Sequence, residues 1–187
     1  NYERLIKQRP FHYEHYIYLA ESYVRTNNRK SAEKYLSILL KLFPNQAYIN
    51  QLKAIHSIQT QQFELAKRHI DITIAQSFSN NETKLLAGLI NYQLENYEQV
   101  ISYLSIVKKN FPNNSFIQKI LFLELCFIIQ KILIAAQLKL GNTEAAYENL
   151  ESIALTDENT QMIATAGLEL LKLGNSKRST QVLSKLN

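Results

Sequence analysis

The chain has 187 residues, of which 46% are hydrophobic, and a formal net charge of +5. Only four Gly and three Pro occur, and helix-forming residues such as Leu, Ile, Ala, Lys, Gln and Glu dominate, so little turn chemistry is left for a β fold. The 21 basic residues are scattered rather than gathered into one patch, which argues against a nucleic-acid partner because a phosphate backbone requires concentrated positive charge. We therefore expect an all-α protein that does not bind nucleic acid.

Apolar periodicity and turn residues predict a series of helices joined by short connections. The turns inside the hairpins are expected at 27–28, 95–96, 141–142 and 174–175, where Asn, Glu-Asn and Gly-Asn pairs stand, with a further turn at Gln61 and Gln62. In chain order the predicted helices cover residues 13–26, 29–42, 47–60, 63–76, 81–94, 97–110, 115–140, 143–155, 160–173 and 176–186.

The sequence repeats itself with a period of about 34 residues, a length that indicates stacked supersecondary units. Phe43-Pro44-Asn45 returns two periods later as Phe111-Pro112-Asn113. Pro10 stands one period before Pro44, so residues 1–12 are expected to be the tail of a preceding unit. The predicted organisation is a single array over 1–187, with units at 13–46, 47–80 and 81–114, an irregular unit at 115–160 and a partial one at 161–187.

The first full unit resembles the tetratricopeptide signature. Large residues, small residues and a final proline stand at the spacing of that family, in the order Tyr16, Leu19, Ala20, Tyr23, Ala32, Leu36 and Pro44. The large residues would fill the core between two paired helices, the small residues would permit close contact, and the proline would end the second helix. The resemblance implies a right-handed α-solenoid of stacked antiparallel helix pairs.

The fourth unit carries about twelve extra residues. The sequence Ile-Gln-Lys-Ile-Leu at 117–121 recurs at 129–133, so the surplus looks like a local duplication. Twelve residues rotate the second copy by about 120° on a helix, so one straight helix cannot present both copies to the same core.

Two outcomes are open for this segment: an over-long helix, or a helix that breaks near Glu124 and Cys126. Its surplus apolar side chains are expected either to pair with a second copy of the chain, giving a homodimer, or to fold back onto the array. These self-association residues are Phe122, Leu125, Phe127 and Ile128.

No motif for catalysis, metal binding or a cofactor is visible. His12 and His15 form the only close histidine pair, and no further ligand completes a metal site, so surface histidines are the favoured interpretation. The four glycines never approach one another, which excludes a glycine-rich phosphate loop. We expect no catalytic residues, no metal and no cofactor. A membrane span at 117–136 is also disfavoured, because Lys119, Glu124 and Lys131 interrupt it.

The remaining candidate for function is a groove. In tetratricopeptide arrays the first helix of each unit lines a concave surface, and the resemblance implies that its second, fifth, ninth, twelfth and thirteenth positions face a ligand. Such a surface suits a peptide or a protein segment. An alternative left open is that these side chains, Ile55, Leu85 and Leu89 above all, only pack against neighbouring helices. The predicted groove residues are Ile17, Glu21, Tyr48, Gln51, Ile55, Gln59, Glu82, Leu85, Leu89, Tyr92 and Gln93.

The segments 84–99 and 134–142 are similar to bacterial repeat lipoproteins of PEP-CTERM exopolysaccharide and sorting systems. This resemblance implies a protein of the bacterial cell envelope, on its periplasmic side, that serves the assembly or export of surface material. The predicted function is therefore a non-catalytic scaffold that holds a peptide or protein. Its alternative is a structural spacer or self-association module that acts through the apolar segment 115–140.

Overall fold

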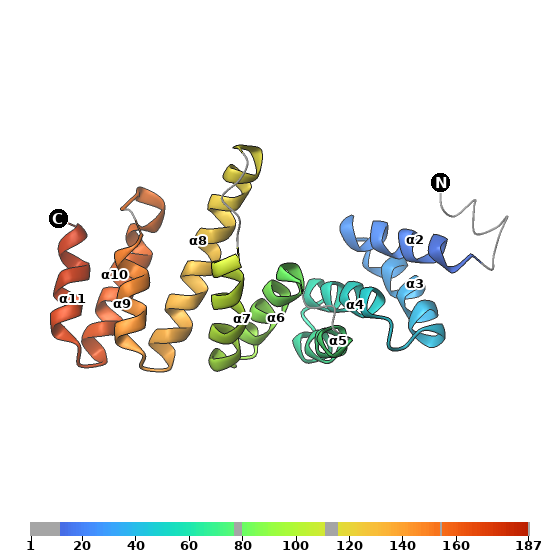
Figure 1. Cartoon of the computed structure of the whole chain (residues 1–187), viewed down its shortest axis with the longest axis horizontal. Helices are drawn as coiled ribbons and strands as arrows, with labels where there is room; N and C mark the ends of the chain where they lie inside the picture. The colour runs from blue at the N-terminus through green and yellow to red at the C-terminus, as the bar shows by residue number, and fades with distance from the viewer. Residues whose placement is uncertain (1–11, 77–79, 111–115, 154, 187) are drawn as a thin grey trace. The chain divides into compact units, whose positions relative to one another are not determined.

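The computed structural model describes residues 12–76, 80–110, 116–153 and 155–186, with the backbone alone at 116–126 and at 158. The described residues form α-helices and one short 3₁₀ helix, with no strand among them (Figure 1). The elements are α2 (Tyr13–Arg25), α3 (Arg29–Leu42), α4 (Ala47–Gln59), α5 (Phe63–Ala75), α6 (Asn81–Gln93), α7 (Tyr97–Asn110), α8 (Phe116–Lys139), α9 (Thr143–Glu151), α10 (Asp157–Lys172), α11 (Ser176–Leu183) and η1 (Ser184–Leu186).

The chain divides into two compact units, Asn1–Leu94 and Glu95–Asn187. In the first unit, α2 packs on α3 and α4 packs on α5, and the first helices α2, α4 and α6 also contact one another in turn. The core between α2, α3 and α4 is built from large residues such as Leu36, Leu39 and Ile49 around two alanines, Ala20 and Ala32, all fully buried. The small residues allow the paired helices to approach closely, as the sequence predicts.

The second unit repeats this arrangement with α8 on α9 and α10 on α11, while α7 packs on α8. Its core joins Ile134 and Leu138 of α8 to Leu150 of α9, Ile163 of α10 and Val182 of α11. α9 and α11, the second helices of their hairpins, also contact each other through side chains. The Arg178 guanidinium donates to Glu144 at 2.8 Å and lies over the Tyr147 ring, 4.1 Å from its centre. Each unit is therefore a stack of antiparallel hairpins with its own apolar interior.

The turn inside each hairpin contains one residue in the left-handed backbone region. These residues are Asn27, Gln61, Glu95, Gly141 and Gly174, with φ between 53° and 81°. In the turns at Asn27, Gln61, Gly141 and Gly174, the next residue donates its backbone N–H to a carbonyl five residues earlier, for example Asn28 to Tyr23 at 2.9 Å and Asn142 to Gln137 at 2.8 Å. This bond is typical of a Schellman helix end. It gives a hydrogen-bond donor to a carbonyl in the last turn that has no partner within the helix.

The surplus residues of the fourth unit lengthen one helix instead of breaking it. α8 runs without interruption from Phe116 to Lys139 and has 24 residues, whereas α4 and α6 have 13 each. Eleven more residues make it about 16 Å longer. Figure 1 shows its first turns extending past the end of α7. Of the alternatives open from the sequence, the over-long helix is the one observed. None of the helices among the described residues is long and apolar enough to cross a membrane.

The predicted helices agree with the observed ones except around residue 155 and at the end of the last helix, where α11 ends at Leu183 and the 3₁₀ helix η1 covers the rest of the predicted 176–186. α9 ends at Glu151 instead of 155, and α10 begins at Asp157 instead of 160. The cause is local: the Asn159 side chain accepts a hydrogen bond from the backbone N–H of Thr156 at 2.9 Å, so the helix begins one turn earlier than its first apolar residues indicate. The all-α fold of stacked helix pairs is confirmed. The third predicted unit, 81–114, crosses the border between the two compact units, and the single array stays a prediction.

A charged and polar cluster lies inside the first unit. Glu33 of α3 accepts hydrogen bonds from Lys53 at 2.6 Å and contacts Nε2 of His56 at 3.0 Å, and both of these α4 residues are buried. A second histidine also contacts a polar side chain of α4: Nδ1 of His69 from α5 lies 2.8 Å from Oδ1 of the buried Asn50. The pair between Lys53 and Glu33 neutralises a buried ammonium group, which would be costly alone.

This cluster shifts three pKa values downward. Burial raises the pKa of Glu33, but the hydrogen bond and charge of Lys53 outweigh it and leave the pKa below its ordinary value. Burial, helped by the positive charge of Lys53, lowers the pKa of His56 and of His69, against the opposing charge of Glu33. Both histidines are therefore neutral in the folded first unit at neutral pH.

We expect acid to destabilise the first unit in two steps. Because the folded pKa of His56 and His69 is depressed, the unfolded chain binds protons first, and stability is lost as the pH falls below the ordinary value of 6.5. The contribution of Glu33 is lost below 4.5. Thermal unfolding of the H56Q/H69Q variant should change less between pH 7 and pH 5 than that of the unchanged chain. An equal change for the variant and the unchanged chain would contradict this assignment.

Gly167 lies where α10 meets α11 most closely. A Cβ there would stand 2.7 Å from Cδ2 and 2.8 Å from Cγ of Leu183, and the Gly167 carbonyl accepts a buried hydrogen bond from Ser179 at 2.7 Å. Replacing Gly167 by Leu should therefore force the helices apart and destabilise the second unit by about 1–3 kcal/mol. Urea unfolding measures this loss. Thr165→Leu, at an exposed position of the same helix, is the control and should change stability by less than about 0.5 kcal/mol.

Candidate functional site

The predicted groove residues all lie in the first unit, on α2, α4 and α6. Most of them are half-buried, and Glu82 and Gln93 are among the more accessible. Gln51 is an exception, since only 2% of it is exposed and its side-chain oxygen accepts a hydrogen bond from Thr83 at 3.4 Å. Its assignment as a groove residue is wrong, because it forms part of the contact between α4 and α6. No feature of the single sequence separates this role from a ligand contact.

Other predicted groove residues also hold neighbouring first helices together. The Gln59 amide donates to the carbonyl of Val24 at 2.9 Å, which ties the end of α4 to the end of α2. Burial and a hydrogen bond to Glu21 raise the pKa of Tyr48 to about 12, so this phenol stays protonated under ordinary conditions. Ile17 and Ile55 pack against the apolar core of the unit. For Ile55 the alternative of packing against neighbouring helices is thus observed. The other predicted groove residues stay predicted ligand contacts.

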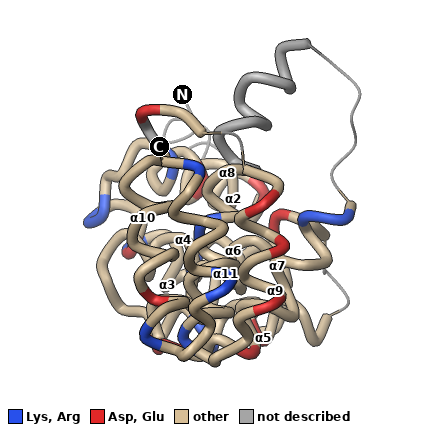
Figure 2. The backbone as a smooth tube through the Cα atoms, turned by 90° about the vertical axis from the view of Figure 1, so that its left-hand side faces the viewer, with Lys and Arg blue, Asp and Glu red and all other residues tan. Residues whose placement is uncertain are grey.

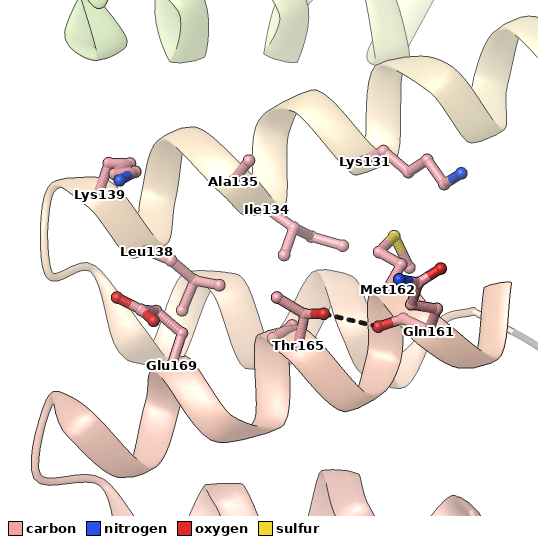
Figure 3. A pocket seen from close by; sticks show the side chains of 10 residues that line it. Lys131, Ile134, Ala135, Leu138, Lys139, Gln161, Met162, Thr165 and Glu169 are labelled. Atoms are coloured by element: carbon pink, nitrogen blue, oxygen red, sulfur yellow. Dashed lines mark hydrogen bonds between the residues drawn. The ribbon is translucent and has the colours of Figure 1, made fainter.

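The second unit contains a groove between its first helices, α8 and α10. It has a volume of about 540 Å³, which lies in the range of small-ligand and peptide side-chain pockets. Figure 3 shows side chains from both helices facing one another across it. The lining residues are Lys131, Ile134, Ala135, Leu138 and Lys139 of α8, and Gln161, Met162, Thr165, Ala166 and Glu169 of α10.

The floor of the groove is apolar and its ends are charged. Ile134 and Leu138 are buried in the core of the unit, and the partly buried Met162 packs against that core from α10. Lys131 and Lys139 stand toward opposite ends of the α8 wall (Figure 3). The Lys131 ammonium lies 4.5 Å from the centre of the Phe127 ring, and the Glu169 carboxylate accepts a hydrogen bond from Lys172 at 3.0 Å. The groove can therefore bury an apolar side chain between two cations.

This groove is not among the sites predicted from the sequence, although the sequence contains a signal for it. Counted back from the Gly141 turn, the same five positions used for the first three units fall on Ile128, Lys131, Ala135, Leu138 and Lys139, and four of these line the groove. Counting forward from Pro112 is displaced by the twelve extra residues. In the irregular unit, the positions that face the groove are therefore found by counting from the turn residue and not from the proline.

The predicted self-association residues lie on the long helix α8. Ile128 is 47% exposed, whereas Phe127 is half-buried and packs against the core of the second unit. The side chains of Phe122 and Leu125 lie outside the described residues. An exposed Ile128 agrees with an apolar contact on this helix, and a homodimer stays a prediction.

Features that would indicate other chemistry are not seen among the described residues. In that part of the chain no group of three or more His, Cys, Asp and Glu side chains could hold a metal ion. Lys and Arg are interspersed with Asp and Glu along the described backbone (Figure 2). The groove between α8 and α10 is thus the candidate site that the geometry supports best.

Comparisons with known proteins agree with the hairpin architecture. Residues 16–45 match the tetratricopeptide repeat family. No curated protein matches the sequence of the chain.

Among solved structures, the fold is similar to that of YrrB, described as a TPR protein with an unusual peptide-binding site, with 14% identity, a TM-score of 0.79 and coverage of 99% of this chain and 90% of that one. It is also similar to MamA AMB-1, with 15% identity, a TM-score of 0.72 and coverage of 92% and 95%. A third is Pseudomonas aeruginosa pilF, with 18% identity, a TM-score of 0.58 and coverage of 93% and 74%.

The resemblance to lipoproteins of PEP-CTERM systems stays a prediction. The matching repeat contains the residues that carry the signature in the sequence, from Tyr16 to Pro44, and the fold of the described chain is that of the solved repeat proteins. The chain therefore contains a tetratricopeptide repeat at residues 16–45, and its fold is similar to that of a solved tetratricopeptide repeat protein.

Proposed function

We propose that the chain is a non-catalytic scaffold that binds a peptide or protein segment in the groove between α8 and α10. The observation that carries the proposal is the form of this groove. It is open to solvent, about 540 Å³ in volume and floored by Ile134, Leu138 and Met162, whose places are fixed by the core beneath them. A preformed apolar slot with charged ends binds a side chain without first having to order its own walls.

The place of the groove in the repeat supports this proposal. It is formed by first helices, which line the ligand surface in tetratricopeptide arrays. YrrB, to which the chain is similar in fold, is described as having a peptide-binding site, and we extend that property to this chain as part of the proposal. Glu82 and Gln93 of the first unit, both accessible to solvent, stay predicted contacts of that unit by itself.

The cellular setting is proposed from sequence resemblance alone. A scaffold of this kind would serve the assembly or export of surface material in the bacterial cell envelope, on its periplasmic side, if it acts as the PEP-CTERM lipoproteins do. The segments 84–99 and 134–142 carry that resemblance. Fractionation of the source cells, with detection of the native protein in envelope and soluble fractions, tests this setting directly.

Filling the groove should abolish binding while the fold is retained. Peptides selected from a random displayed library on the full chain are expected to bind the Ala135→Trp variant at least about ten-fold more weakly, because an indole on the α8 wall occupies the space of the ligand side chain. Fluorescence anisotropy measures the affinity, and circular dichroism confirms that the helices are intact.

Thr180→Trp, on an exposed position of α11, adds the same side chain outside the groove and should leave the affinity unchanged. The proposal is wrong if no peptide is enriched, or if the enriched peptides bind the Ala135→Trp variant as tightly as the unchanged chain.

A second function is favoured by the length of α8. The helix is about 16 Å longer than its counterparts, and Ile128 on it is 47% exposed, so this surface could pair with another copy of the chain and make the protein a structural spacer.

If α8 mediates self-association, Ile128→Asp should shift the chain from dimer to monomer in light scattering at high micromolar concentration. The Asp would have to be desolvated in an apolar contact. Ile106→Asp, at an exposed apolar position of α7, is the control and should leave the mass unchanged. A monomeric mass for the unchanged chain at this concentration rules out the spacer function.

A further inference from the structure

We infer that the partner segment of the groove is acidic, with one apolar side chain placed between two carboxylates. This inference rests on the proposed function, since it names the chemistry of the ligand that the same groove takes. It is drawn from the charges on the groove walls, which are positive in balance over the described side chains.

On the α8 side of the groove, the charged residues with described side chains are all basic. From Phe127 to Lys139 the helix contains Lys131 and Lys139 and no acidic residue. The described structure pairs Lys131 with the face of Phe127 and gives neither lysine a carboxylate partner. Among the described side chains, neither ammonium group is neutralised, so each can pair with a carboxylate of the partner.

The opposite wall does not neutralise these cations. Among the described lining residues Glu169 is the one acidic residue, and its carboxylate is engaged by Lys172 on the same helix at 3.0 Å. Lys172 thus neutralises Glu169, and the charge balance of the described lining residues is positive. An acidic segment is attracted to such a site, and a basic one is repelled.

The spacing of the two lysines fixes the spacing of the charges on the partner. Lys131 and Lys139 are eight residues apart on α8, which corresponds to about 12 Å along the helix axis. An extended peptide covers this distance in about four residues, since it rises about 3.3 Å per residue. Two carboxylates four positions apart can therefore reach both lysines.

The residue midway between the carboxylates would stand over the apolar floor. In the extended segment its side chain points to the groove together with the two acids, because side chains at i, i+2 and i+4 share one face. The floor below it is formed by Ile134, Leu138 and Met162. Leu168 lies on the same face of α10 as Gln161 and Thr165, is 53% exposed, and extends the apolar surface beyond the groove.

The test uses three labelled peptides that differ only at the two flanking positions. Each has a central Leu, and the residues two positions before and after it are both Glu, both Gln or both Lys. We expect the Glu peptide to bind the full chain about ten-fold more tightly than the Gln peptide, since two exposed ion pairs at about 0.7 kcal/mol each give a factor of ten. The Lys peptide should bind more weakly than the Gln peptide, and about 0.5 M salt should remove most of the preference.

Charge reversal on the protein identifies the lysines. Lys139→Glu should weaken the Glu peptide at least about ten-fold and should strengthen the Lys peptide, and Lys131→Glu should act in the same direction. Lys177→Glu makes the same change of charge on α11, outside the groove, and should alter either affinity by less than about two-fold. Thermal unfolding of each variant shows that the fold is kept.

The outcomes separate this inference from the proposed function. If the Gln peptide binds as tightly as the Glu peptide, and Ala135→Trp still weakens both, the groove binds apolar segments and the acidic assignment is overturned. The same conclusion follows if none of the three peptides binds while library peptides bind in a manner that depends on Ala135. If neither the three peptides nor any library peptide binds through the groove, both the inference and the proposed function are overturned.

Discussion

The hairpins depend on a backbone reversal that recurs once in each repeat. Asn27, Gln61 and Glu95 follow one another at the repeat period, and each adopts the left-handed conformation that lets one helix end and the next begin antiparallel to it. Two of these residues are not Asn or Gly, so Gln61 and Glu95 accept a backbone strain that the packed helices on either side must offset. Apolar packing, small-residue contacts and the orientation of the first helices all follow from where this reversal falls.

The irregular fourth unit shows how the array absorbs an insertion. The interval from Glu95 to Gly141 exceeds the repeat period by the twelve duplicated residues, and the next interval, to Gly174, falls one residue short of the period. The insertion lengthens α8 at its beginning and leaves its last turns in register with α9 and α10. The register of the groove is preserved because the last turns of α8 are placed by the Gly141 reversal and not by the start of the helix.

Much of the fold could be predicted from the sequence, because its signals are local. The turn pairs at 27–28 and 141–142, the alanines that allow close contact and the repeat period are all visible in one chain. The site was harder to predict, since it depends on contacts between residues of different repeats. The burial of Gln51 requires Thr83 of the next repeat, and the groove requires α8 and α10 to lie side by side, while the duplication hid the positions on α8 that face it. The early start of α10 depends on an Asn159 side-chain bond that apolar periodicity does not register.

The confinement of contacts to hairpins near in sequence has a kinetic consequence. In the first unit the core joins α2, α3 and α4, and in the second the packing involves α7 to α11 within fewer than a hundred residues. Little loop-closure entropy is lost when such contacts form, so the rate of assembly is set by local helix pairing rather than by a search for distant partners. A hairpin can thus begin to pack as soon as its second helix has been synthesised, before the residues that follow it exist.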